Sequence, residues 1–125
     1  MTPYDQTHHQ PPAPVAFLTL RTLDHAHSVA NVMALLDTGS DLTLLPRWAI
    51  EQLSLTPQVE EGYTLAWFDG SNRVVESVVL EAHFQGGRFQ GRYALIDEPL
   101  GIVGRNLLNH FRLLFDGPAK AWNTI

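Results

Sequence analysis

The nine residues VANVMALLD, residues 29–37, constrain the fold most, because they are almost wholly apolar and end on a carboxylate. A short apolar run bounded by turn residues is typical of a strand, and a strand this apolar is expected to be buried on both faces. The preceding segment, VAFLTLRTL, alternates between a face with Phe17 and Thr19 and a face with Leu18 and Leu20. We expect the two segments to pair as a hairpin around the polar turn DHAHS.

The rest of the chain also divides into short apolar segments separated by turn residues. Asp69-Gly70 lies between two alternating arms and predicts a hairpin turn, and Glu76 and Glu81 in the second arm are expected near solvent. Pro46 suits the first turn of a short helix, PRWAIEQL, because its missing N–H is not needed there. We predict further strands for LTLL, GGRFQGRYALI, the start of GIVGRNLLNHF, and RLLFD. A helical turn is expected after GIVG, and KAWNTI is expected to form an extended terminal segment. Six to eight short strands and two short helices indicate an all-β domain, closed or sandwich-like.

The composition suits one globular domain, which we place at residues 15–125. Residues 1–14 are polar and rich in proline, and are predicted to form a flexible N-terminal arm. The net charge of −5, without a Lys or Arg cluster, argues against binding of nucleic acid and against contact with an anionic membrane surface. The sequence has no Cys, no secretory leader pattern and no apolar run long enough to span a bilayer, so a cytoplasmic protein without disulfides is expected.

Two histidine pairs come closest to a metal-binding spacing. His8-His9 lies in the arm, and we interpret it as two solvated side chains. His25 and His27 form an H-x-H in a polar turn, and we interpret them as turn residues. No metal and no cofactor is therefore expected.

Asp37 is followed by Thr38, Gly39 and Ser40, and this tetrapeptide is the strongest candidate for chemistry in the sequence. Gly39 allows the backbone to turn sharply after the apolar strand, which presents the carboxylate at the strand end. Ser40 is placed to donate a hydrogen bond to that carboxylate, and the Thr38 hydroxyl to brace the backbone. The same four residues also form ordinary loops with local side-chain to backbone bonds, so the tetrapeptide alone leaves catalysis and structure equally open.

A second motif, IVGRNLL at residues 102–108, follows the predicted hairpin, and the two motifs together resemble the retroviral-type aspartic proteases, the retropepsins. Those proteins carry apolar-apolar-Asp-Thr-Gly-Ala/Ser in their first third, then a flap hairpin, then apolar-apolar-Gly-Arg-Asn/Asp before a C-terminal helix. The resemblance covers residues 15–115. It implies an all-β, retropepsin-like closed β-barrel with short helices, which forms one half of a two-fold aspartic protease dimer.

The resemblance also implies roles for individual residues. Asp37 would be the catalytic carboxylate, Thr38 would interlock with the same loop of a second copy, and Gly39 would line the substrate path. Asp41 and Arg105 would form an ion pair; both adjoin stretches that look buried, where a charge is tolerated only when it is paired. Substrate contacts are expected from Ser40, Asp41, Trp67, Phe68, Asp69, Gly70, Ile102 and Val103, and structural support from Gly104, Arg105 and Asn106.

Aspartic-protease chemistry needs two carboxylates, but the sequence contains Asp-Thr-Gly only once. A symmetry-related copy must supply the second, so the expected function is an endopeptidase that acts on polypeptides as a homodimer. The segments PVAF and KAWNTI are candidates for a sheet between the subunits. The predicted flap departs from the family pattern, because WFDGSNR has a single Gly and begins with two aromatic residues that either pack the hairpin or close over substrate.

Two other interpretations stay open. A catalytically silent retropepsin-like domain would serve as a dimerisation or binding module of a larger protein, since a fold does not dictate an activity. An unrelated β-barrel that binds a small ligand would place Asp37 in a simple loop and would make the second motif a coincidence. An intact Asp-Thr-Gly-Ser favours the enzyme.

Overall fold

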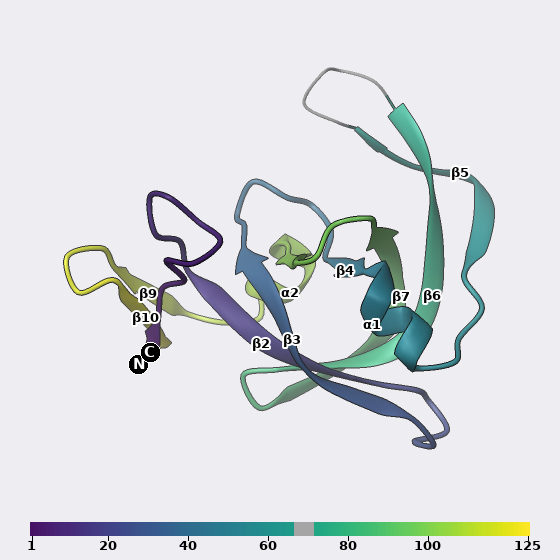
Figure 1. Cartoon of the computed structure of the whole chain (residues 1–125), viewed down its shortest axis with the longest axis horizontal. Coiled ribbons are helices and arrows are strands. Elements are labelled where there is room, and N and C mark those ends of the chain that lie inside the picture. Colours follow the sequence, from purple (N-terminus) through teal and green to yellow (C-terminus); the bar gives the residue numbers. More distant parts are fainter. Residues whose placement is uncertain (67–71) are drawn as a thin grey trace.

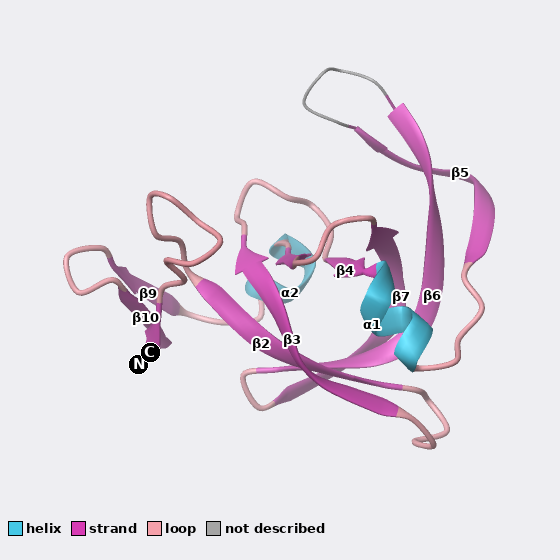
Figure 2. Ribbon diagram, viewed as in Figure 1, coloured by secondary structure: helices cyan, strands magenta, loops and turns pink. Residues whose placement is uncertain are grey.

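The computed structural model describes residues 1–66 and 72–125, which contain ten strands and two helices (Figures 1 and 2). The strands are β1 Thr2–Pro3, β2 Val15–Arg21, β3 Ser28–Leu36, β4 Leu44–Pro46, β5 Gln58–Ala66, β6 Asn72–Phe84, β7 Gly87–Ile96, β8 Gly101–Val103, β9 Leu113–Asp116 and β10 Ala121–Thr124. The helices are α1 Arg47–Gln52 and α2 Arg105–Leu108. Within the described ranges, neither helix is long and apolar enough to cross a membrane.

Six of these strands close into a barrel, in the order β2-β3-β8-β4-β7-β6, because β2 pairs with β3 on one side and with β6 on the other. The closing seam joins residues 19–21 of β2 to residues 81–83 of β6. β5 pairs with β6, and the two strands project together beyond the barrel (Figure 1). The predicted all-β closed barrel is therefore confirmed.

The hairpin of β2 and β3 has the predicted antiparallel pairing, but β3 is not buried on both faces. Val29, Val32 and Ala34 point into the barrel, whereas Met33 on the other face is only half-buried. Val29 and Val32 share a face, although they are three residues apart, because a bulge shifts the register between them. Asn31 takes up the extra residue with a φ of 59°, a left-handed conformation that asparagine tolerates better than most residues. The prediction was wrong because apolar content alone does not show whether other elements cover the second face of a strand.

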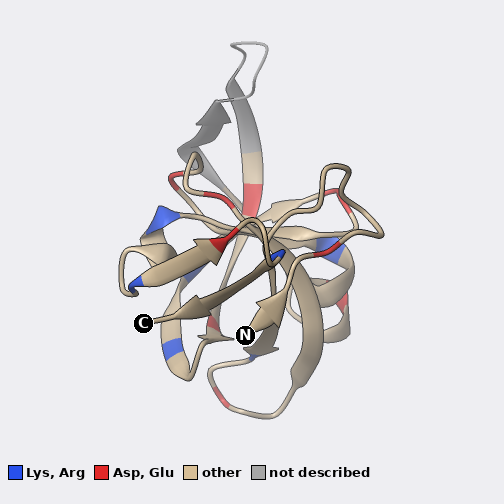
Figure 3. Ribbon diagram, turned by 90° about the vertical axis from the view of Figure 1, so that its left-hand side faces the viewer, with Lys and Arg blue, Asp and Glu red and all other residues tan. Residues whose placement is uncertain are grey.

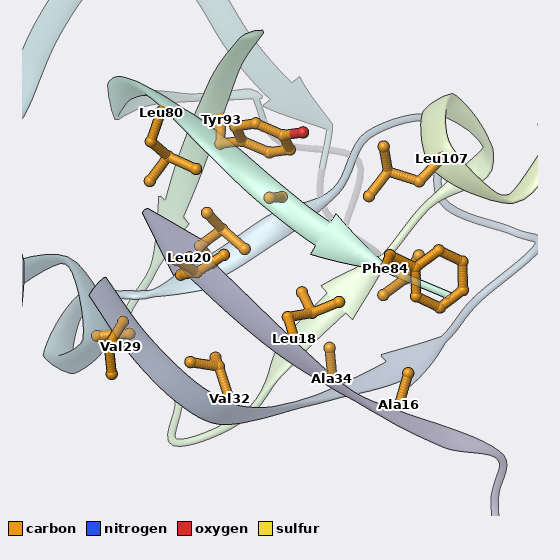
Figure 4. Close-up of a cluster of buried hydrophobic side chains, with 14 of the residues drawn as sticks. Ala16, Leu18, Leu20, Val29, Val32, Ala34, Leu80, Phe84, Tyr93 and Leu107 are labelled. Carbon is orange, nitrogen blue, oxygen red and sulfur yellow. The ribbon is translucent and has the colours of Figure 1, made fainter. Parts of the chain in front are cut away.

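The main core fills the barrel with branched aliphatic side chains from facing strands (Figure 4). Leu18 and Leu20 of β2 are fully buried, and Leu80 and Phe84 of β6 pack in the same cluster. α1 closes the core beside β3 and β4, because its apolar face places Ala49 and Ile50 inward.

The three strands β1, β10 and β9 form a second sheet, in that order, outside the barrel (Figure 1). Trp122 of β10 anchors this sheet, since its side chain is completely buried and its ring lies 6.3 Å from the ring of Phe84. The Trp122 indole N–H donates a hydrogen bond of 2.8 Å to the Val15 carbonyl. The KAWNTI segment therefore forms β10, which lies between β1 and β9, and PVAF lies at the start of β2, which pairs with β3 there and with β6 only at residues 19–21.

Residues 1–14, predicted to be a flexible arm, have a defined path in the structure. β1 pairs with β10, and Asp5 and Ala13 form an isolated bridge that closes the segment into a loop. The Asp5 carboxylate accepts a hydrogen bond of 2.8 Å from the His9 ring. His9 is thus half-buried and bonded, not solvated as predicted. This hydrogen bond, followed by those from His8 and Thr7, lowers the pKa of Asp5 to about 2.

Glu81 was predicted near solvent, but its carboxylate is buried at the seam that closes the barrel. It accepts hydrogen bonds from the His83 ring at 2.5 Å, from the Arg21 guanidinium at 3.0 Å and from the Gln90 amide at 3.2 Å. The bond from His83, followed by those from Arg21 and Gln90, lowers the pKa of Glu81 to about 2. The alternation placed Glu81 correctly on the outer face, but long polar neighbours cover it there.

We expect this carboxylate to make the unfolding free energy depend on pH. Its pKa is lower in the folded protein than the ordinary value of 4.5, so its contribution is complete above about pH 4.5 and is lost as the pH falls towards 2. Urea unfolding of the wild type and of Glu81→Gln, measured from pH 2 to 7, checks this. The two midpoints should differ most near neutral pH and converge at pH 2, and a difference that does not depend on pH would contradict the assignment.

The predicted flap is described only in part. Its two arms pair antiparallel, with Ala66 of β5 opposite Asn72 of β6. The predicted turn and substrate contacts at Trp67, Phe68, Asp69 and Gly70 lie outside the described residues.

Candidate active site

Asp37 lies directly after β3, at the end of the strand that the apolar run predicted. Its backbone N–H donates to the Val103 carbonyl at 3.0 Å, which continues the parallel pairing of β3 with β8 by one residue. Its side chain is half-exposed, and Oδ1 accepts a hydrogen bond of 2.9 Å from the Gly39 N–H. One carboxylate oxygen is therefore oriented by the loop itself, at the surface of the chain.

The loop after Asp37 turns as predicted, but the hydroxyl of Ser40 has a different hydrogen-bond partner from the predicted one. The Ser40 N–H donates to the Asp37 carbonyl at 3.2 Å, which closes a tight turn through Thr38 and Gly39. The Ser40 hydroxyl donates to the Leu42 carbonyl at 2.7 Å and not to the Asp37 carboxylate. The expected serine-carboxylate bond was wrong, because the backbone amide of Gly39 takes that position. Thr38 and Gly39 are exposed at the tip of the turn.

Gly104 packs against the same loop from the side of the second motif. A Cβ atom added at this position would lie 2.3 Å from the Leu42 carbonyl oxygen and 2.9 Å from the Ser40 carbonyl oxygen. Both are backbone atoms, so no rotamer change can relieve the contact. The backbone N–H of Arg105 then donates to the Ser40 carbonyl at 2.9 Å. The two motifs therefore touch through their backbones, and this contact requires a glycine.

Thr43 links the two motifs, although it was not among the predicted site residues. It is 1% exposed, and its hydroxyl accepts from the Gly104 N–H at 3.1 Å and donates to the Asn106 side chain at 2.7 Å. The signal in the sequence was a threonine within the apolar segment LTLL, since a buried hydroxyl needs partners. Asn106, predicted as structural support, holds the loop through this threonine.

Arg105 at the start of α2 bonds to the loop at two points. One guanidinium nitrogen donates to the Thr38 carbonyl at 2.7 Å, and the other bonds to the Asp41 carboxylate. The side chain of Asp41 is 81% exposed and that of Arg105 is 42% exposed. The predicted pair is present, but the argument that burial requires it was wrong. An ion pair so exposed contributes little to the stability of the isolated chain.

Ile102 and Val103 of β8 differ in what they can contact. Val103 is 0% exposed and belongs to the main core, so its side chain cannot reach a substrate as predicted. Val103 contributes to the site through its backbone carbonyl, which accepts the hydrogen bond from the Asp37 N–H. Ile102 is half-buried, and it packs against a small cluster that contains Leu44 and Val75. Alternation along β8 explains the difference, because neighbouring side chains of a strand point to opposite faces.

Comparison with known proteins supports the fold. The sequence matches no protein-family model and no curated protein. Among solved structures, the chain is similar to the EIAV protease complexed with the inhibitor HBY-793, with a TM-score of 0.60 and 21% sequence identity. The match covers 78% of this chain and 86% of that one. The chain therefore has a retropepsin-like fold.

Proposed function

We propose that this retropepsin-like fold is one half of an aspartic endopeptidase, which is active as a homodimer with one Asp37 from each copy. The observation that carries the proposal is the geometry of Asp37. Its carboxylate stands half-exposed at a strand end, one oxygen is oriented by the Gly39 amide, and the loop around it is held by the second motif. This single centre is half of the pair that peptide hydrolysis by carboxylates requires.

The chemistry follows from bringing two such carboxylates together. Two negative charges a few ångströms apart repel, so the pair retains one proton. The ionised carboxylate takes a proton from a water molecule held between the two, and the protonated one donates a hydrogen bond to the carbonyl oxygen of the scissile peptide. The water attacks the carbonyl carbon, and the proton moves on to the leaving amine. Neither carboxylate performs these steps alone.

The surrounding residues have supporting roles in this proposal. Thr38 and Gly39, exposed at the tip of the turn, meet the same turn of the second copy and the substrate backbone. Ser40, Asp41 and Ile102, with the flap, line the path of the polypeptide. Arg105 keeps the turn in position through the Thr38 carbonyl.

A dilution series tests the proposal. Because only the dimer has both carboxylates, we expect peptidase activity per mole of chain at acidic pH to fall as the protein is diluted below its dimer dissociation constant. A statine-type peptide, which mimics the gem-diol intermediate, should inhibit the activity and should shift the chain towards the dimer. The readout is cleavage of a peptide library together with sedimentation velocity at each concentration. Activity per mole that stays constant while the protein is monomeric would rule the proposal out.

A further inference from the structure

The N-terminal arm brings a second acidic side chain close to Asp37. The Leu36 N–H donates to the Pro14 carbonyl at 3.0 Å, so the antiparallel ladder of β2 and β3 continues to the residue before Asp37. One step further along, the same register places Ala13 opposite Asp37. Asp5 in turn pairs with Ala13 through two backbone hydrogen bonds, of 2.8 and 3.1 Å. Asp5 therefore lies two strand spacings, or about 10 Å, from Asp37.

The two carboxylates also share a face. Leu36 points into the main core, so Asp37, the next residue, points outward. Residues that pair across a ladder point their side chains to the same face, so Ala13 and Asp5 face outward as well. Figure 1 shows the arm at the end of the hairpin where β3 ends, and Figure 3 presents this side of the molecule to the viewer.

The Asp5 carboxylate organises the loop that follows it. Only 7% of the Asp5 side chain is exposed, and it accepts hydrogen bonds from the backbone N–H groups of Thr7 at 3.3 Å and of His8 at 2.8 Å. The rings of His8 and His9 also bond to it through Nδ1, at 3.4 and 2.8 Å. Because Nδ1 of each ring faces Asp5, Nε2 of each ring is directed away from it.

The two histidines differ in exposure. The side chain of His8 is 47% exposed, whereas that of His9 is 22% exposed. A histidine at acidic pH carries a proton on both ring nitrogens and donates through both. His8 then donates through Nδ1 to Asp5 and offers Nε2 to a group outside the chain. His9 is the less accessible of the two, and it holds the loop through Asp5.

The charges around the loop favour an anionic partner at acidic pH. The pKa of Asp5 is about 2, so Asp5 stays ionised and contributes −1, and the two protonated histidines contribute +2, which leaves the loop with a charge of +1. Of the segments that bond to the arm, the end of β3 adds Asp37. The turn before β10 adds Lys120, whose carbonyl accepts from the Tyr4 N–H at 2.8 Å.

We propose that His8 is a specificity-determining residue, which donates through Nε2 to an acidic side chain of the polypeptide substrate about three residues from the scissile bond. The inference rests on the proposed function. A polypeptide that crosses Asp37 towards the arm rises about 3.3 Å per residue, so the 10 Å between Asp37 and Asp5 corresponds to about three residues. In a two-fold homodimer the same preference applies on both sides of the cleaved bond.

The first test compares the wild type with His8→Gln and with a matched control, His27→Gln. His27 is exposed in the turn between β2 and β3, at the other end of the hairpin from Asp37. Two peptides that differ only in Glu or Gln at the third residue from the cleaved bond are assayed at about pH 5, where most glutamate side chains are ionised. We expect the wild type and His27→Gln to favour the Glu peptide about tenfold in kcat/KM, and His8→Gln to cleave both equally.

The second test changes the charge at the same position. His8→Lys keeps a positive charge and should retain the preference for the Glu peptide. His8→Glu should instead favour a peptide with Lys at the third residue over the Glu peptide. Added salt should weaken both preferences, because the contact is exposed. A folding defect would lower the rates for all peptides together, so it cannot reverse their order.

Binding measurements separate this inference from the proposed chemistry. Fluorescence anisotropy of labelled peptides on the Asp37→Asn protein gives the ratio of affinities without cleavage, and adding His8→Gln should abolish that ratio. Equal kcat/KM for the Glu and Gln peptides in the wild type, or an unchanged preference in His8→Gln, would overturn the role of His8 and leave the peptidase intact. Selective binding of the Glu peptide by a wild type that cleaves neither peptide would support that role and count against the peptidase.

Discussion

Replacing Asp37 by Asn is expected to lower kcat/KM for peptide hydrolysis about 10⁴-fold, because the dimer then has no carboxylate to take the proton from water. Asn is nearly the same shape, and its side-chain oxygen can still accept the hydrogen bond from the Gly39 N–H. The variant should therefore keep the melting temperature and the dimer dissociation constant of the wild type. Hydrolysis rates, thermal unfolding and sedimentation measured on the same preparation check these expectations.

Mixing the Asp37→Asn chain with the wild-type chain makes the experiment more specific. If both copies must contribute a carboxylate, an excess of the Asp37→Asn chain converts wild-type dimers into mixed dimers with a single Asp37. Activity should then fall with the square of the wild-type fraction, and not in proportion to it. A linear fall, or an Asp37→Asn protein as active as the wild type, would show that the chain does not work as a paired-carboxylate enzyme.

Replacing Gly104 by Ala is expected to have the largest effect on stability among single-atom changes at the site. The added Cβ would lie 2.3 Å from the Leu42 carbonyl oxygen, and the backbone of either β8 or the active-site loop must shift. We expect a loss of about 3 kcal/mol in the free energy of unfolding, or about 10 °C in melting temperature, typical of overpacking against a rigid neighbour. Because the loop carries Asp37, peptidase activity should fall even in the fraction that stays folded.

Gly91→Ala is the matched control for Gly104→Ala. A Cβ atom at Gly91 would meet nothing within 4 Å, so the same chemical change should leave the melting temperature within about 2 °C of the wild type. Chemical unfolding of the two variants and of the wild type provides the comparison. Equal stability of the Gly104→Ala and Gly91→Ala proteins would mean that the contact between the two motifs is looser than the structure indicates.

Most of the fold could be predicted from local features of the sequence, because turn residues separate its short apolar segments so regularly. The hairpin of β2 and β3 and the strand that ends on Asp37 follow from alternation and apolar content. β1 could not be predicted, because two residues carry no period and their pairing with β10 depends on distant parts of the chain. The bulge at Asn31 was missed because it depends on the register with β2, and the burial of Glu81 was missed because it depends on side chains from neighbouring strands.

The candidate site could be predicted as a set of residues more readily than as a set of contacts. Asp37 and Arg105 were identified through the two motifs, because motif residues need no knowledge of the fold. The hydroxyl of Ser40 and the side chain of Val103 were placed wrongly, since their directions depend on backbone angles and strand phase. Thr43 was missed because a threonine in an apolar segment indicates only that its hydroxyl needs partners, and not that these partners lie in the second motif.

The pairing of β1 with β10 leaves the two chain ends side by side (Figure 1). A flexible linker from the last residue of one copy to the first residue of a second copy would therefore leave the barrel of each copy undisturbed. If two copies were encoded as one polypeptide, the Asp37 carboxylate of either copy could be replaced without changing the other. The roles of proton donor and proton acceptor could then be assigned to one copy or the other.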